Sequence, residues 1–170
     1  MKRITLLVWL VLMISSMVGC SGKMLRPEDR MGDMKLLSYC EGELVNKLCT
    51  TDELYEGTCE IPAGVTDLWI SAGWAEPTMD ELELSWKDST WKMTFDGHQV
   101  DLSAFGTYDV EITDPLVGPM KARVWNFCVS NITPGKHNAR YDFYLANGPR
   151  LGNHVEEWTF TVLKPEASNP

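Results

Sequence analysis

Apolar and polar residues alternate along most of the chain after residue 61. At residues 90–95, Trp91, Met93 and Phe95 occupy every second position, and polar residues stand between them. A period of two is typical of a strand with one buried face and one face in water. The same pattern, together with short apolar and aromatic runs, predicts strands at residues 67–75, 81–86, 90–95, 98–102, 108–112, 121–129, 139–145 and 158–162.

Turn signals separate these predicted strands. Asp96-Gly97 follows directly on residues 90–95. An Asp-Gly pair between alternating segments is the strongest short-range hairpin signal, because both turn residues must adopt positive φ. Thr133-Pro134-Gly135-Lys136 fits a type II turn, and Asn147-Gly148 is a further turn signal. No long helical pattern interrupts this order, so the sequence predicts an all-β fold of about seven or eight strands.

The stretch at residues 129–137 narrows this expectation. It resembles the strand–"Leu-x-Pro-Gly-x-Tyr"–strand crossover of immunoglobulin-like and fibronectin type III-like domains. Ile132 stands at the leucine position, and His137 stands where these families often have tyrosine. The resemblance implies an immunoglobulin-like β-sandwich at residues 61–164, with residues 118–145 as its best-supported hairpin. A jelly roll is the alternative.

The first 22 residues follow a different pattern. Lys2 and Arg3 precede an uncharged, largely apolar run that ends in Met17-Val18-Gly19-Cys20. These features are typical of a secretory signal peptide. With a cysteine directly after the cut, the segment resembles the signal of bacterial lipoproteins. The resemblance implies removal of residues 1–19 and attachment of fatty acyl chains such as palmitate to Cys20. The protein would then be lipid-anchored, extracytoplasmic and part of the cell envelope. The alternative is an ordinary signal peptide that contains a cysteine.

Residues 20–38 are polar and irregular, and we expect them to form a flexible tether. Residues 39–60 form a cysteine-rich segment. Within it, Thr50 and Glu53 have the spacing of a capping box, so a short helix is predicted there, ending near Gly57. Residues 165–170 form a polar tail that we expect to be disordered.

Four cysteines remain when Cys20 is set aside. In an exported protein they are expected to form two disulfides, in one of three pairings. Their spacing is not that of a zinc site or a redox motif. The pairing favoured from the sequence joins Cys40 to Cys49 and Cys59 to Cys128.

Charge and motifs limit the classes of function. The formal net charge is −9, and removal of Lys2 and Arg3 with the signal would make it more negative by two. Such a surface repels phosphate backbones, so nucleic acid is not an expected partner. Familiar catalytic motifs are absent, so we expect no enzyme and no cofactor. His98, His137 and His154 fall at predicted turns or strand edges and are expected to be exposed, without converging on a metal.

Tryptophan is the one unusual component of the expected mature chain. By alternation, most of the tryptophans belong to buried faces, whereas Trp69 and Trp125 share faces with polar residues. Exposed tryptophans can stack on a sugar ring or anchor a protein contact. The leading hypothesis is therefore a non-enzymatic binding module of the cell envelope, whose partner is an envelope protein or a glycan. The alternative is a carbohydrate-binding module that uses Trp69 and Trp125.

Overall fold

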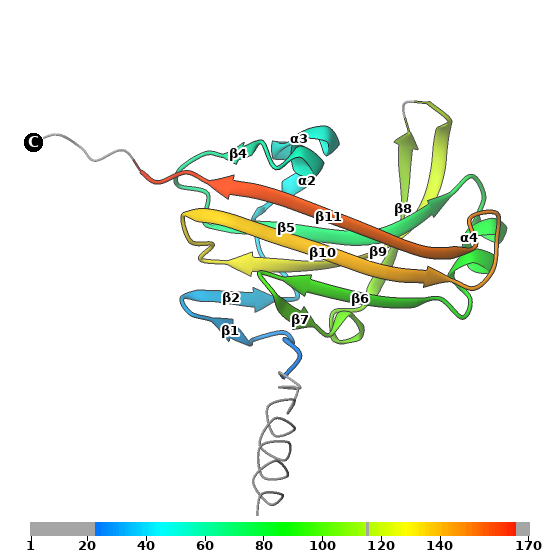
Figure 1. Ribbon diagram of the computed structural model, residues 1–170, viewed down its shortest axis with the longest axis horizontal. Helices are drawn as coiled ribbons and strands as arrows, with labels where there is room; N and C mark the ends of the chain where they lie inside the picture. Colours follow the sequence, from blue (N-terminus) through cyan, green and yellow to red (C-terminus); the bar gives the residue numbers. More distant parts are fainter. Residues whose placement is uncertain (1–22, 115, 166–170) are drawn as a thin grey trace, which may run out of the picture.

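The computed structural model describes residues 23–114 and 116–165, which are mostly β (Figure 1). Sheet I has six strands. Five run in the order β1 (Arg30–Met31), β2 (Met34–Leu37), β9 (Gly118–Ser130), β5 (Asp67–Glu76) and β3 (Glu43–Leu44), and β8 (Thr107–Asp114) also pairs with β9. Sheet II has the order β4 (Cys59–Ile61), β11 (Gly152–Val162), β10 (Gly135–Leu145), β6 (Thr90–Phe95) and β7 (His98–Val100). Both sheets are mixed, because β3 pairs with β5 in parallel and β4 pairs with β11 in parallel.

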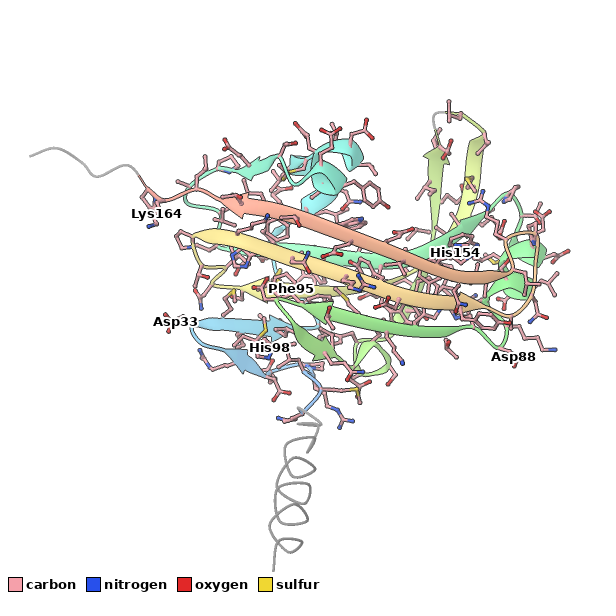
Figure 2. All side chains as sticks on the ribbon, in the orientation of Figure 1. Asp33, Asp88, Phe95, His98, His154 and Lys164 are labelled. Atoms are coloured by element: carbon pink, nitrogen blue, oxygen red, sulfur yellow. A yellow bond between two sulfur atoms is a disulfide. The ribbon has the colours of Figure 1, made fainter. Side chains whose placement is uncertain are left out.

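The hydrophobic core lies between the two sheets. Leu68 and Ile70 of β5 and Phe127 of β9 are fully or almost fully buried on the sheet I side. Phe95, which is labelled in Figure 2, and Phe160 bury their side chains in the core from sheet II. The Phe95 ring meets the Phe127 ring edge-on, with the ring centroids 6.0 Å apart. Burying one such side chain contributes about 1.5–3 kcal/mol. The alternation in the sequence therefore predicts the all-β character correctly.

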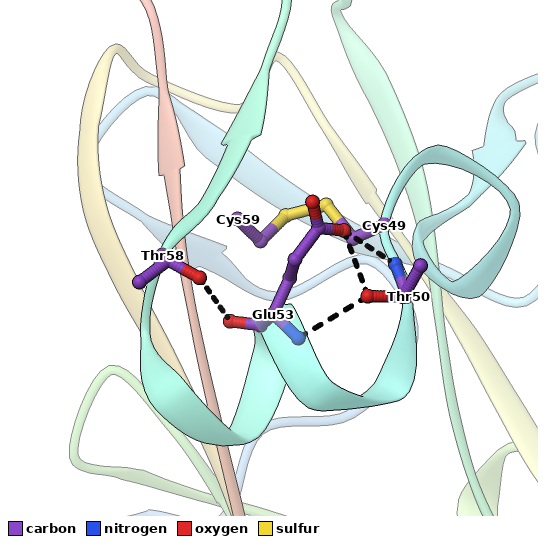
Figure 3. Close-up of a disulfide and its surroundings, with 5 residues drawn as sticks. All are labelled: Cys49, Thr50, Glu53, Thr58 and Cys59. Carbon is purple, nitrogen blue, oxygen red and sulfur yellow. Dashed lines mark hydrogen bonds between the residues drawn. A yellow bond between two sulfur atoms is a disulfide. The ribbon is translucent and has the colours of Figure 1, made fainter.

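Short helical segments accompany the two sheets, and three of them contribute Val45, Leu54 and Leu102 to the core. They are α2 (Val45–Leu48), α3 (Thr51–Glu56), α4 (Met79–Trp86) and the 3-10 turn η1 (Leu102–Ala104). At the start of α3, the Thr50 hydroxyl accepts from the Glu53 amide, and the Glu53 carboxylate accepts from the Thr50 amide at 2.7 Å (Figure 3). Gly57 ends the helix with φ of 69°. The predicted capping box and helix end are confirmed.

Helix α4 replaces a strand that the sequence predicts at residues 81–86. Thr78 caps this helix by accepting from the Glu81 amide at 3.3 Å, and acidic residues fill its first turn. Leu82 is fully buried whereas Leu84 is half exposed, so the two do not share a face. The alternation of Leu82, Leu84 and Trp86 is therefore not strand alternation, and the strand prediction is wrong.

The predicted turns have two different outcomes. Asp96 and Gly97 have φ of 47° and 76° and join β6 to β7 as a hairpin, which confirms that prediction. By contrast, residues 118–145 do not form a hairpin. β9 pairs within sheet I and β10 pairs within sheet II, so Pro134 and Gly135 belong to a crossover between the sheets. Alternation shows that each strand has a buried face, but it cannot show which sheet the strand joins.

Part of the expected tether belongs to the fold. β1 and β2 turn around Gly32 and pair with each other, and β2 then pairs with β9. Leu36 is fully buried in the core. The apolar positions Met34 and Leu36 bury one face of β2, which is why residues 30–37 order on sheet I instead of forming a tether.

The disulfides join Cys40 to Cys128 and Cys49 to Cys59. The favoured pairing is therefore wrong, although the expected number of two bonds is confirmed. Leu37 of β2 lies opposite Cys128 of β9, and this register brings Cys40 beside Cys128. Cys49 and Cys59 stand at the two ends of the α3 segment, which brings them together (Figure 3).

The expected signal peptide with Cys20 at residues 1–22, and residues 166–170 of the expected tail, lie outside the described residues. Among the helices of residues 23–165 apart from residue 115, none is long and apolar enough to cross a membrane.

Candidate binding surface

The hairpin of β8 and the first half of β9 extends beyond the packed sheets (Figure 1). Its two faces differ in chemistry. Asp109 lies opposite Arg123, and Glu111 lies opposite Lys121, on one face. The other face carries Val110 opposite Ala122 and Ile112 opposite Met120. The hairpin is therefore strongly amphipathic, although it stands outside the main core.

Ion pairs hold the charged face. The Arg123 guanidinium donates to both carboxylate oxygens of Asp109, at 2.6 and 2.8 Å, and to Glu83 of α4 at 2.6 Å. The hydrogen bond from Arg123 lowers the pKa of Asp109 and the pKa of Glu83 below their usual values. Lys121 pairs with Glu111 in the next row. Arg123 therefore fixes the hairpin to α4, with its own side chain mostly buried and both carboxylate partners accessible to water.

The apolar face lines an open groove. Val110 and Ile112 remain 40% and 42% exposed, whereas Met120 and Ala122 are buried at the floor. The groove measures about 490 Å³ and has a mainly apolar lining. A strand usually turns its polar face to water and its apolar face to the core. In β8 the charged face is held in ion pairs and the apolar face is open to solvent. Exposed apolar patches of this kind mark interaction surfaces.

The free edge of β5 runs along this groove. β3 pairs with β5 only at residues 43–44, after which Val45 begins α2. In the described part of the chain, β5 has no strand partner on that side from residue 70 to residue 76. Ser71, Gly73 and Ala75 line the groove there. At Gly73, a Cβ atom would lie 2.3 Å from the Arg123 carbonyl oxygen, so only glycine allows β9 to approach this closely.

Glu156 of β11 lies at the groove beside Tyr55 and Trp158. Burial raises the pKa of Glu156 above its usual value, and a hydrogen bond from Tyr55 and the charge of His154 offset this only in part. Glu156 forms no ion pair with any residue that the structure describes. The buried indole N–H of Trp158 also lacks an acceptor within the described ranges.

The other end of the groove is built around Trp74. Its indole N–H donates to the buried Glu76 carboxylate at 2.7 Å, and the Ser85 hydroxyl of α4 donates to the same oxygen at 2.7 Å. The Arg150 guanidinium lies over the Trp74 ring at 5.2 Å. These contacts fix the end of β5 against α4.

A second, shallower recess adjoins the groove on the same face of sheet I. It measures about 590 Å³ and shares Leu44, Val110 and Asn126 with the groove. Trp69 lines it, and Tyr39, which is 73% exposed, meets the Trp69 ring edge-on at 6.0 Å.

The two tryptophans singled out from the sequence do not share a surface. Trp69 is half-buried at the recess, on the outer face of sheet I. Trp125 lies opposite Ala72 on the inner face, where it packs against Trp86 of α4 at 4.7 Å and Trp91 at 5.0 Å. Trp125 was expected to be exposed because it shares a face with Arg123 and Phe127, opposite to Val124 and Cys128. That face is the inner one, where Phe127 is almost fully buried.

His137 is buried, not exposed as predicted, with 4% of its surface accessible. Its Nδ1 lies 2.8 Å from the Asp96 carboxylate, and its Nε2 lies 2.7 Å from the Thr133 carbonyl oxygen. His137 therefore ties the crossover to the β6–β7 turn. His98 is exposed and His154 is half-buried against Phe143, and these two lie well apart (Figure 2). Among the described residues, the three rings do not form a cluster that could hold a metal.

Sequence reasoning missed most of the groove. Val110 and Ile112 were predicted to lie on the buried face of a strand, and Glu156 was not considered. One signal was available: the acidic residues at 109 and 111 and the basic residues at 121 and 123 share the spacing of cross-strand pairs.

No protein-family model and no curated protein matches this chain. Two solved structures resemble it in part. The solution structure of amebosin is 12% identical with a TM-score of 0.30, over 74% of this chain and 100% of that chain. The cysteine protease inhibitor EhICP2 from Entamoeba histolytica is 10% identical with a TM-score of 0.31, over 75% of this chain and 100% of that chain. At such TM-scores, neither likeness carries an argument about this protein.

Proposed function

We propose that this protein is a non-enzymatic binding module of the cell envelope, held at the outer face of a membrane by a lipid on Cys20. The groove beside the β8–β9 hairpin is its binding surface. The amphipathic hairpin carries this proposal. Its charged face is already paired, at Asp109 and Arg123, while Val110 and Ile112 on its apolar face stay in solvent. An apolar face that the molecule does not cover itself is suited to a partner.

The immunoglobulin-like assignment is part of this proposal. Its support is the crossover at Ile132, Pro134 and Gly135, which leads from sheet I to sheet II, and the position of His137. In immunoglobulin-like domains, a tyrosine near this corner bonds to the backbone a few residues upstream. Here the His137 ring bonds to the Thr133 carbonyl, four residues upstream, and takes an equivalent place.

The anchor is tested by expressing the full chain in a bacterial host. We expect the protein in the membrane fraction, with an intact mass that matches residues 20–170 plus acyl chains. Stable anchoring requires more than one acyl chain, because a single chain binds only marginally. Cys20→Ser is expected to release the protein into the soluble fraction. Retention of the Cys20→Ser protein in the membrane fraction would contradict the lipid anchor.

Carbohydrate binding is the second candidate function, and the recess at Trp69 favours it. Trp69 and Tyr39 stand beside polar Asn126 and Lys47, which is the combination that recognises a sugar ring and its hydroxyls. Tryptophan fluorescence titrated with a glycan panel tests it, with Trp69→Ala as the variant. A glycan response that survives Trp69→Ala would place carbohydrate binding away from this recess.

A further inference from the structure

We propose that the groove takes an extended, positively charged segment of a partner protein, which adds to the free edge of β5 as a further strand. This inference rests on the proposed binding function and specifies the class of partner. It is carried by three features of the groove: an incomplete strand row, a group of exposed apolar side chains, and a carboxylate without an ion-pair partner among the described residues.

The incomplete row lies beside β5. Leu44 pairs with Trp69, and then the chain leaves the sheet because α2 starts at Val45. The position that a longer β3 would occupy, next to residues 70–76, has no strand within the described part of the chain. The backbone N–H and C=O groups of a free edge are a template for another strand, and many peptides bind by adding to such an edge.

The side chains around this edge leave room for a strand. Residues 71–75 of β5 all line the groove, and all of them except Trp74 are small. Val110 and Ile112 of β8 line the same groove from the far side of β9, and each is about two-fifths exposed. An added strand would direct every second side chain into the groove, over the small residues and toward Val110 and Ile112, because strand side chains alternate between faces.

The charge of the groove favours a basic segment. Glu156 lies half-buried at the rim without an ion-pair partner in the described residues, and Asp114 also lines the groove. Among the described residues that line the groove, the one lysine or arginine is Arg150, and it lies over the Trp74 ring. A lysine or arginine of the partner would compensate Glu156. Such a charge-assisted hydrogen bond is stronger than a neutral one.

The same charge argument disfavours a second copy of this chain. Two copies would pair β5 with β5, and β5 contains two acidic residues, Asp67 and Glu76, and no basic residue. A second β5 would therefore bring no cation to Glu156. The net charge of −9 adds repulsion between copies.

The test uses the full chain with Cys20→Ser, which cannot carry a lipid, and a random-peptide display library as the probe. We expect the selected peptides to combine alternating apolar residues with lysine or arginine. Synthetic copies of these peptides should bind the Val110→Lys variant about tenfold or more weakly than they bind the parent protein. Thr113→Lys is the matched control, because it adds the same charge to the opposite face of the same strand, and it should bind as the parent does.

A second comparison isolates the carboxylate. The basic peptides should bind the Glu156→Gln variant about tenfold more weakly than the parent. A peptide with norleucine in place of the lysine should bind both proteins with the same affinity. Circular dichroism and a denaturation midpoint confirm that each variant is folded. Equal effects of Glu156→Gln on both peptides would show that the charge pair does not form.

Each remaining outcome contradicts the inference in a distinct way. Failure of the library to yield binders, or binders unaffected by Val110→Lys, would remove the peptide site. Concentration-dependent dimers that Val110→Lys dissociates would assign the groove to a second copy. A glycan signal that Val110→Lys abolishes would assign it to carbohydrate. None of these results bears on the lipid anchor. Conversely, if the full chain expressed in a bacterial host carried no acyl groups but still bound the peptides, the anchor would be contradicted and the groove would stand.

Discussion

The two ends of the molecule are held together by different interactions. At one end, Cys40–Cys128 and Cys49–Cys59 attach the N-terminal segments to the two sheets, and the capping box fixes α3. At the other end, the β8–β9 hairpin leaves the packed sheets and is held by the ion pairs of Arg123. Covalent bonds constrain the first end, whereas solvent-accessible charges and an incomplete strand row characterise the second.

This difference separates stability from binding. Regions that bind partners are drawn from the less stable parts of a fold, because they must leave surface uncovered. The disulfide-bonded end covers its apolar residues, such as Leu36 and Leu54. The hairpin end leaves Val110 and Ile112 uncovered. We therefore expect substitutions at the first end to change the free energy of unfolding more than substitutions at the second.

The largest effect is expected from removing the long-range disulfide. Cys40→Ala with Cys128→Ala opens a loop that spans 88 residues of sequence separation, which in the chain-entropy model lowers the free energy of unfolding by about 4–5 kcal/mol. Urea denaturation of the oxidised protein and of the double variant measures this. A loss below about 1 kcal/mol would show that the first end does not depend on this bond.

Removing the short-range disulfide is expected to cost less. Cys49→Ala with Cys59→Ala opens a loop with a sequence separation of only 10, for which the same model gives about 2–3 kcal/mol. The capping box of α3 remains in this variant and continues to hold the helix. A cost equal to that of the Cys40 and Cys128 variant would contradict the ranking.

Removing the hairpin clamp should have a smaller and more local effect. Arg123→Met eliminates the bonds to Asp109 and Glu83 while keeping much of the side-chain volume, and should cost about 1–2 kcal/mol. The matched control is Arg140→Met, whose ion pairs with Asp142 and Glu157 are more exposed, so we expect less than about 1 kcal/mol there. Hydrogen exchange should show faster opening of β8 in Arg123→Met. Unchanged exchange in β8 would show that Arg123 does not hold the hairpin.

The smallest effect concerns pH, at His137 between the two ends. Burial lowers the pKa of His137, and the hydrogen bonds to Asp96 and Thr133 together raise it by more than burial lowers it. The pKa of His137 therefore lies above the ordinary value of 6.5. The Thr133 carbonyl oxygen and a carboxylate both accept hydrogen bonds, so the two ring nitrogens can donate to them together only when the ring is protonated.

A raised pKa in the folded state gives the sign of the pH dependence. The stabilisation from protonated His137 is fully present below the unfolded pKa and is lost as pH rises through the folded pKa. Denaturation midpoints measured from about pH 6 to about pH 8 should therefore fall with rising pH, and His137→Gln should remove this slope. His98→Gln is the control at an exposed ring. An unchanged slope in His137→Gln would assign the pH dependence to another group.

The sequence predicts local signals well and their three-dimensional context poorly. Thr50 with Glu53 and Thr78 with Glu81 have the same helix-start spacing, and both start helices. The first was recognised because no strand pattern competes with it. The second was overlooked because Leu82, Leu84 and Trp86 alternate, and a pattern this short fits a strand as well as a helix.

The candidate site shows the same limit. The alternation of Tyr108, Val110 and Ile112 correctly predicts β8 as a strand. It could not show that the hairpin leaves the packed sheets and keeps its apolar face in solvent, because that depends on the approach of β9 at Gly73 and on the end of β3 at Leu44. These are long-range contacts, and no short segment of the sequence contains them.

Hydrogen exchange of the full chain with Cys20→Ser, measured with and without a selected basic peptide, tests the central claim most directly. If the groove accepts an added strand, the backbone amides of residues 70–76 that point away from β9, about every second one, become protected when the peptide binds, because they pair with its backbone. Protection confined to the outer edge of β8 or to sheet II, or no new protection in β5, would contradict the claim that the free edge of β5 is the binding surface.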